Sequence, residues 1–329
     1  MKSIHLKVAT LILAVASPLA AAEKRHVVMI AGRPSHGPGE HEHNAGVLLL
    51  AKCLRDNAAD LVEVKVHLNA EWPAEAELQQ ADTVLIYADG AGGHPALRDN
   101  HLQQLSKQMA RGCGFVCLHF AVEVPVKPGG TEFKGWLGGY FETGWSVNPV
   151  WDATYKVFPK HPVCQGVKPF GTHDEWYFHM RFQDGMNGVT PILTDMPPAQ
   201  TIASSDSERG GNPAVRLALQ SKEPQHTAWA TERPDGGRGF GFTGGHYHKG
   251  WANNQQRKLV LNAVVWTAKV QVPANGIDSK VSADEMLENL DDKGQGPRNN
   301  PAAAAASAAP PPQAVPGVGY GVEDAKKKI

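Results

Sequence analysis

The chain has 329 residues, with 32 lysines and arginines against 33 aspartates and glutamates, so its formal net charge is -1 with neutral histidine. This balance argues against a nucleic-acid partner or an anionic membrane surface, because both call for a basic face. No apolar run reaches the roughly 20 residues needed to span a bilayer, so we expect no membrane span. The unusual feature is the set of 15 histidines, several of which are grouped beside glycines.

Residues 1–22 have the order of features of an export signal. Lys2 and Lys7 give a positive start, an apolar stretch runs from Val8 to Val15, and Ala20–Ala22 offers small residues for cleavage. A buried N-terminal helix is the alternative. We expect the mature bacterial protein to be exported and to act in the periplasm or as a secreted protein.

A first series of elements is predicted between residues 26 and 120. Short apolar runs predict strands and apolar positions at three-to-four spacing predict helices, in strict alternation. This alternation is typical of an α/β protein with a mainly parallel sheet. The strands are expected at His26–Ala31, Leu61–Leu68, Thr83–Ala88 and Gly114–Phe120, and the helices at Glu42–Ala58, Glu71–Ala81 and Pro95–Arg111.

The second half of the body is less regular. From about Val124 to Pro234 the chain is rich in glycine, proline and tryptophan, so we expect loops and antiparallel additions. Strand-like runs occur at Ala153–Phe158 and Ala214–Leu219. A last strand at Gly239–Thr243 and a closing helix at Asn254–Ala268 complete one domain of residues 23–270.

The C-terminal part, residues 271–329, is expected to be a low-complexity tail that is mostly extended or disordered. Pro301 to Pro312 contains only alanine, serine and proline, which cannot bury enough apolar surface to offset the entropy of ordering. Ser282 and Glu285 have capping-box spacing, so Ser282–Leu290 is predicted to form one short helix.

The four cysteines, Cys53, Cys113, Cys117 and Cys164, contain no CxxC pair, which excludes a zinc ribbon or a thioredoxin-type motif. Cys53 and Cys117 lie within apolar patterns. We favour structural thiols over a disulfide, because buried free thiols are common.

Polar clusters follow the predicted strands. Ligands of parallel α/β sheets bind beyond the carboxyl ends of the strands, so side chains from distant segments are expected to converge there. Asp89-Gly90 and His94 follow the third strand. The side chains selected from the other clusters are His36, His41, Glu42 and His43 after the first strand, His119 and Glu123 at the fourth, Asp174, Glu175 and Trp176 in the middle, and His246 and His248 after the last.

Two chemistries use such a set of imidazoles and carboxylates. They bind a divalent metal such as zinc or manganese, or they act as general acid and base. His41, His119 and His246 are the metal candidates, and together with Glu42 and Glu175 they are the catalytic candidates, with Glu42 or Glu175 acting as the base. Substrate contacts are expected from the remaining residues, which are His36, His43, Glu123, Asp174, Trp176 and His248.

Each candidate has a structural alternative. His119 could be a satisfied core histidine, and Glu42 could merely favour the helix dipole. Only one of His246 and His248 should point inward along an extended segment, and the glycines before His246 favour that residue. The P-loop and GxGxxG patterns are absent from the sequence, so no nucleotide cofactor is expected.

These motifs resemble the ThuA-like (trehalose utilisation) family. The residues that carry the resemblance are Pro34 to Glu42 (PSHGPGEHE), Leu118-His119, His173 to Tyr177 (HDEWY) and Gly244-Gly245-His246. It covers roughly residues 25–270. The resemblance implies a flavodoxin-like three-layer α/β/α fold related to the class I glutamine amidotransferases, and a carbohydrate-related role such as the turnover of 3-keto glycosides.

The amidotransferase relatives place a nucleophilic cysteine at the tight turn after a central strand. Here that turn is expected to hold His119, with Cys117 inside the strand, so glutaminase chemistry is not expected. We expect an exported enzyme that acts on a small-molecule carbohydrate as a lyase, isomerase or hydrolase. The alternatives are a metal-dependent hydrolase of a non-sugar substrate and a non-catalytic carbohydrate-binding protein, and the oligomeric state is open.

Overall fold

A computed structural model of the chain describes residues 23–294. They form three layers, and the middle layer is a seven-stranded sheet of order β2-β1-β3-β4-β11-β10-β9. The first five strands in this order are parallel, and β10 and β9 add in antiparallel fashion. The strands are β1 (Arg25–Ala31), β2 (Val62–His67), β3 (Thr83–Tyr87), β4 (Gly114–Leu118), β9 (Val189–Asp195), β10 (Gln225–Glu232) and β11 (Arg238–Phe242). This is the α/β fold that the sequence predicts.

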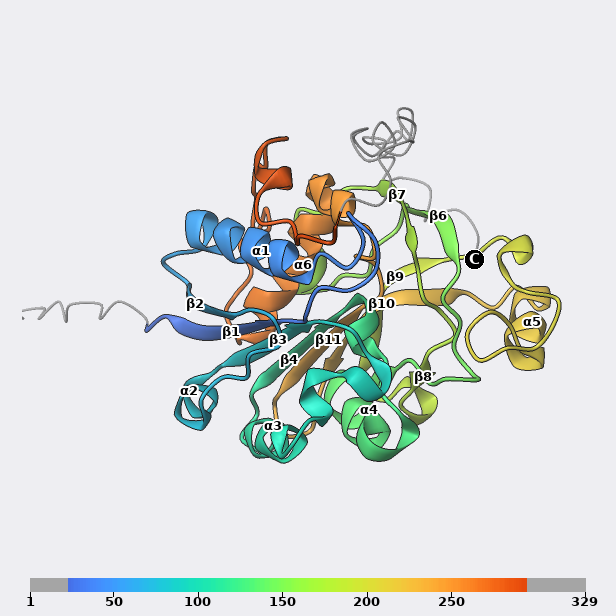
Figure 1. Cartoon of the computed structure of the whole chain (residues 1–329), viewed down its shortest axis with the longest axis horizontal. Helices are drawn as coiled ribbons and strands as arrows, with labels where there is room; N and C mark the ends of the chain where they lie inside the picture. The colour runs from blue at the N-terminus through green and yellow to red at the C-terminus, as the bar shows by residue number, and fades with distance from the viewer. Residues whose placement is uncertain (1–22, 295–329) are drawn as a thin grey trace, which may run out of the picture.

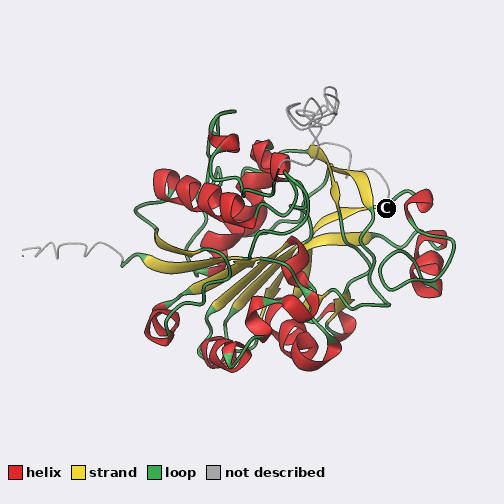
Figure 2. Ribbon diagram, in the orientation of Figure 1, coloured by secondary structure: helices red, strands yellow, loops and turns green. Residues whose placement is uncertain are grey.

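Helices cover both faces of the sheet (Figures 1 and 2). One face carries α1 (His43–Asn57) and α6 (Asn254–Thr267), and the other carries α2 (Glu75–Gln80), α3 (His101–Ala110) and α4 (Thr131–Leu137). Two hydrophobic cores result, and alternate residues of β1 serve them: Val27 and Met29 pack into one, Val28 and Ile30 into the other. No helix among residues 23–294 is long and apolar enough to cross a membrane.

Burial on both faces explains why the early strands appear in the sequence as continuous apolar runs. The predicted strands and helices up to residue 120 are confirmed to within a few residues at their ends. The exception is the segment Pro95–Arg111, which divides into a 3-10 turn at Pro95–Leu97 and α3.

The middle of the chain adds two small antiparallel pairs beside the main sheet. β6 (Val150–Tyr155) pairs with β7 (Phe170–Glu175), and β5 (Gly139–Tyr140) pairs with β8 (Arg181–Phe182). These pairs, with β9 and β10, confirm the antiparallel additions that the sequence predicts.

The strand predicted at Ala214–Leu219 is wrong, because this segment forms the helix α5 (Pro213–Gln220). The Asn212 side chain accepts a hydrogen bond from the Val215 N–H at 3.0 Å, and Pro213 occupies the first turn. An N-cap followed by proline is a helix start signal, and it outweighs the strand-like apolar run.

The C-terminal boundary also differs from the prediction. Residues 271–294 pack on the body, with Val272 and Ile277 buried in its core, so the ordered chain extends beyond residue 270. Ser282 and Glu285 form the expected reciprocal capping bonds, at 2.7 and 3.1 Å, but only a 3-10 turn at Glu285–Leu287 follows. The predicted leader, residues 1–22, and the part of the predicted tail (residues 271–329) that begins at residue 295 lie outside the described residues.

Candidate metal centre

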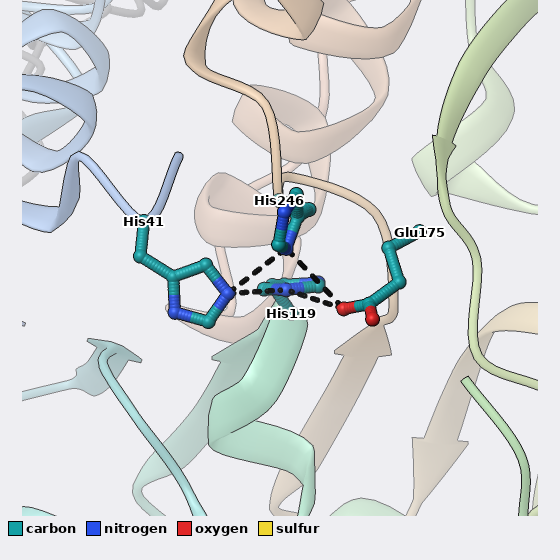
Figure 3. Close-up of side chains that lie close together, drawn as sticks. All are labelled: His41, His119, Glu175 and His246. Atoms are coloured by element: carbon teal, nitrogen blue, oxygen red, sulfur yellow. Dashed lines mark hydrogen bonds and ion pairs between the residues drawn. The ribbon is translucent and has the colours of Figure 1, made fainter. Parts of the chain in front are cut away.

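Four side chains from four separate segments meet at the carboxyl edge of the parallel strands (Figure 3). His41 lies in the loop after β1, His119 directly follows β4, His246 lies in the loop after β11, and Glu175 ends β7. Each offers one ligand atom, and these atoms all lie within 4.8 Å of one another. The convergence predicted from the strand-end positions therefore exists for these four residues.

The nitrogen and oxygen atoms that face the middle of the cluster lie 3.0–3.5 Å from their neighbours. His41 Nε2 lies 3.0 Å from His246 Nδ1 and 3.1 Å from His119 Nε2. Glu175 Oε2 lies 3.3 Å from His246 Nδ1 and 3.5 Å from His119 Nε2. Three imidazole nitrogens and one carboxylate oxygen thus surround a common point.

Unusual backbone conformations present the histidines. His41 and His119 have φ values of 44° and 53°, in the left-handed region that costs a non-glycine residue about 1–3 kcal/mol. Gly245 has a φ of 106°, which a side chain would rarely adopt, and it turns the chain immediately before His246. Such strain is often found at functional sites, and here it is located at the converging side chains.

The outer nitrogens of two histidines are already hydrogen-bonded. His119 Nδ1 lies 2.8 Å from the carbonyl oxygen of Thr243, which can only accept, so Nδ1 carries the hydrogen. His41 Nδ1 lies 2.7 Å from Asp89 Oδ1 and donates to it in the same way. The Nε2 atoms of both rings therefore turn lone pairs toward the centre, and a carboxylate behind the ring is the usual outer partner of a metal-binding histidine.

The electrostatics favour neutral rings at two of the three histidines. Burial lowers the pKa of His41 to about 4 and holds the pKa of His119 well below its usual range. Burial would also lower the pKa of His246, but the hydrogen bond and charge of Glu175 outweigh it and raise that pKa. Despite its own burial, hydrogen bonds from His41 and Ser35 lower the pKa of Asp89 to about 2.

Asp174 holds the loop that carries His246. Its carboxylate accepts hydrogen bonds from the backbone N–H groups of Gly245 at 2.7 Å, His246 at 3.0 Å and Glu175 at 2.9 Å. Burial raises the pKa of Asp174 to about 6. The structure thus gives this residue a positioning role, in place of the predicted substrate contact.

Glu42 is not part of the centre, which corrects its prediction as a catalytic base. Its carboxylate accepts hydrogen bonds from the backbone N–H groups of Gly39 at 2.9 Å and Asp291 at 2.8 Å, and it pairs with Lys293 at 3.2 Å. The side chain is only 1% exposed. The Glu42 carboxylate is therefore buried just before α1 and points toward the C-terminal segment that contains Asp291 and Lys293.

Three predicted substrate ligands are buried in other surroundings. Trp176 is packed in the core, and the carboxylate of Glu123 binds Arg209 at 2.6 Å and Thr143 at 3.0 Å. His248 is buried as well as His246, because the chain turns at His248–Ala252 and the expected alternation of an extended segment ends. The burial of Trp176, Glu123 and His248 contradicts their prediction as substrate contacts.

The two remaining histidines lie next to the centre. His36 is exposed and stacks on His41 with 3.6 Å between ring centroids. Its position keeps it a candidate for substrate contact. His43 is fully buried, with Nδ1 3.1 Å from the carbonyl oxygen of Arg33, so it supports the loop and is shielded from a substrate.

Three further side chains take part in the site without having been selected from the sequence. Asp89 binds His41, the hydroxyl of Tyr177 lies 3.2 Å from His119 Nε2, and the Asn148 amide donates to Glu175 Oε1 at 3.1 Å. Asp89 follows a predicted strand, and this signal could have identified it. Asn148 lies in an irregular loop, where no pattern marks it.

Cys117 is fully buried in the core on the α2–α4 side of the sheet, and burial raises the pKa of its thiol. All four cysteines, at positions 53, 113, 117 and 164, are free. His119 takes the turn after β4, so no thiol is presented at that turn.

The fold and site together define a three-layer α/β protein with a buried histidine-rich centre at the edge of its parallel strands. The chain belongs to the ThuA family, described as trehalose utilisation, whose model matches residues 28–267. None of the curated proteins compared with the chain matches it.

Two solved structures resemble the fold. A ThuA-like protein from Bacteroides uniformis superposes with a TM-score of 0.52 at 14% sequence identity, over 77% of this chain and 95% of that chain. A ThuA-like protein from Parabacteroides merdae gives a TM-score of 0.49 at 14% identity, over 75% of this chain and 90% of that chain. At such identity the first of these similarities supports the fold alone.

Proposed function

We propose that the chain is an exported carbohydrate-processing enzyme in which His41, His119 and His246 hold a divalent metal, zinc or manganese, with Glu175 as the general base. The observation that carries the proposal is the meeting of three imidazole nitrogens, since His246 Nδ1 lies 3.0 Å and His119 Nε2 lies 3.1 Å from His41 Nε2. Two of these nitrogens direct lone pairs inward, so they repel one another unless a proton or a cation lies between them. A divalent ion satisfies all three at once.

The donor set suits such an ion. Zinc in catalytic sites takes three protein ligands and keeps a fourth position for water or substrate. The 3.0 and 3.1 Å separations from His41 Nε2 are close to the spacing of about 3.3 Å between ligand atoms that lie about 2.0–2.1 Å from a tetrahedral zinc ion, so the cluster has the size of such a site. Neutral imidazole is the form that ligates, and burial already favours it at His41 and His119.

Glu175 is the better placed of the two predicted bases. Asn148 holds its Oε1, its Oε2 faces the histidines, and its side chain is 17% exposed, so a substrate at the mouth of the site could reach it. Glu42 is paired with Lys293 and shielded from such a substrate. The carboxylate of Glu175 is also placed to be a fourth metal ligand. Loss of the carboxylate would weaken metal binding if Glu175 is a ligand, but would leave the metal bound if Glu175 is only the base.

The substrate class is proposed from the family description and from the chemistry of the site. In a 3-keto glycoside the C2 proton is acidic because it lies next to the C3 carbonyl. Glu175 would take this proton, and the electron pair left on C2 would form an enolate; a cation held by His41, His119 and His246 would supply positive charge near the enolate oxygen. The electron pair would then form a C1–C2 double bond as the bond to the C1 substituent breaks, and the substituent would leave as an alcohol after taking up a proton; alternatively, reprotonation of the enolate would give an isomer.

The test is a substrate panel assayed with and without chelator. We expect turnover of 3-keto glycosides, loss of turnover with chelator and its return on adding zinc or manganese. Turnover of esters or amides instead would support the metal-dependent hydrolase. Binding of sugars without turnover across the panel would contradict an enzymatic role and support a carbohydrate-binding protein.

A further inference from the structure

A C-terminal strap, residues 285–294, lies against the start of α1 and the loop that carries His41. Lys52 on α1 pairs with Glu285 at 2.8 Å, and the Asn44 amide donates to Asp291 Oδ1 at 2.7 Å. The backbone N–H of Asp291 donates to Glu42 at 2.8 Å. The strap thus contacts α1 at Asn44 and Lys52, and it also contacts Glu42, which precedes α1 and is next to His41.

Lys293 makes the contacts that reach furthest into the His41 loop. Its ammonium lies 3.2 Å from Glu42 Oε1, donates to the backbone carbonyl of Glu40 and lies 3.5 Å from the carbonyl of Gly37. The lysine side chain is only 4% exposed and that of Glu42 only 1%. A buried ion pair and two carbonyl contacts therefore hold the residues on both sides of His41.

The His41 loop needs such contacts because it contains neither helix nor long strand. His36 and His41 both have positive φ values, 60° and 44°, which an unrestrained loop would leave. On the side facing β11, the loop is held by the bond from His41 N to the His246 carbonyl oxygen at 2.9 Å. On its other side, the strap supplies the charged partner of Glu42.

The strap lies outside the part of the chain that the family model matches, which ends at residue 267. It therefore adds to the His41 loop a contact that the matched domain does not include. We infer that Lys293 is a positioning residue of the metal centre, acting through Glu42 and the Glu40 carbonyl to keep His41 directed at His119 and His246. This inference rests on the proposed metal binding.

The experiment compares zinc affinity, by competition with a chromophoric chelator, in the full mature chain and its variants. Lys293→Met is expected to weaken zinc binding about 10-fold or more, the range seen for outer-shell partners of metal ligands. Lys293→Arg keeps the charge and should restore most of the affinity. The matched control is Lys280→Met, which changes an exposed lysine in the same C-terminal segment and should leave affinity unchanged.

Removing Lys293 alone leaves Glu42 as a buried, unpaired charge, which could prevent folding. The double variant Glu42→Gln/Lys293→Met has no such charge and still lacks the cross-link. It should fold and bind zinc more weakly than the wild-type chain. Wild-type affinity in this double variant, or in a folded Lys293→Met protein, would overturn the inference.

Hydrogen exchange separates this inference from the proposed function. The amides of residues 39–43 should exchange faster in Lys293→Met than in Lys280→Met, whether or not metal is added. Failure of the wild-type chain to bind zinc would contradict the proposed metal site, and the exchange comparison would still test the strap. Equal exchange rates in the two variants would overturn the role of Lys293.

Discussion

His41 and His246 lie 205 positions apart in the chain, and their Nε2 and Nδ1 atoms lie 3.0 Å from each other. The strands that precede them, β1 and β11, are not neighbours, since β3 and β4 lie between them in the sheet. The two loops therefore reach toward each other above β3 and β4, and they meet above His119, which follows β4. The centre forms only when the parallel part of the sheet is complete.

Asp89 should matter for metal affinity although it is not a ligand in the proposed site. Its bond to His41 Nδ1 fixes the ring and its hydrogen, so that Nε2 keeps a lone pair for the ion. Asp89→Asn is expected to weaken zinc binding about 10- to 100-fold, as other outer-shell changes do. Chelator competition measures this, with the exposed Asp60→Asn as control. Equal affinities of the two variants would contradict the role of Asp89.

Glu175→Gln separates the role of base from that of ligand. If Glu175 is the base, the variant should keep its metal but lose turnover by about 100-fold or more, the usual contribution of a general base. Metal content and rate are measured on the same sample, and exposed Glu71→Gln serves as control. Loss of the metal itself would instead make Glu175 a ligand, and unchanged turnover would exclude both roles.

Asp174→Ala should destabilise the fold as well as the site. The change leaves the buried N–H groups of Gly245 and His246 without their acceptor. The expected loss of unfolding free energy is about 2–4 kcal/mol, measured by urea denaturation. The exposed residue Asp152, replaced by alanine, should change stability little. Equal stability of the two variants would show that the loop does not depend on Asp174.

Stability should fall as the pH is lowered, because several buried histidines are held neutral. Burial lowers the pKa of His43 and of His94 to about 4 from the ordinary value of 6.5. Between these values the unfolded chain binds more protons than the folded one, so each histidine removes up to about 1.4 kcal/mol of unfolding free energy per pH unit. The effect is absent above the unfolded pKa and is complete below the folded one.

Urea denaturation of the metal-free chain across this range measures the slope. His94→Gln should make the slope shallower, since His94 is fully buried against Phe133, with Nε2 3.1 Å from the Ala121 carbonyl, and is not one of the four residues of the centre. Stability that stays constant or rises as the pH falls from 6.5 toward 4 would contradict the neutral state of these rings.

The parallel half of the fold could be predicted because local signals agree there with the tertiary structure. Strands buried on both faces appear as apolar runs such as Thr83–Tyr87, and the helices between them keep an apolar face. The prediction is wrong at α5, because the apolar run resembles a strand while the N-cap at Asn212 starts a helix. It also failed at the strap, where Asp291 and Lys293 are held by polar contacts that composition cannot reveal.

The four-residue cluster could be predicted in part, because strand-end positions bring distant residues to one edge of a parallel sheet. His41, His119, Glu175 and His246 were all among the candidates. Glu42 was misplaced because the partner that draws it away, Lys293, lies 251 positions later in the chain, and no local pattern links them. Tyr177 and Asn148 depend on side-chain directions that the sequence does not specify.

The central claim is a metal bound by the three histidines, and the most direct measurement is the metal content of the mature chain. The protein is loaded with zinc or manganese, freed of excess ion and analysed for bound metal beside His119→Ala. The account predicts about one equivalent in the wild-type chain, as for a catalytic zinc site, and far less in the variant. A wild-type chain without metal, or a variant with the same content, would contradict it.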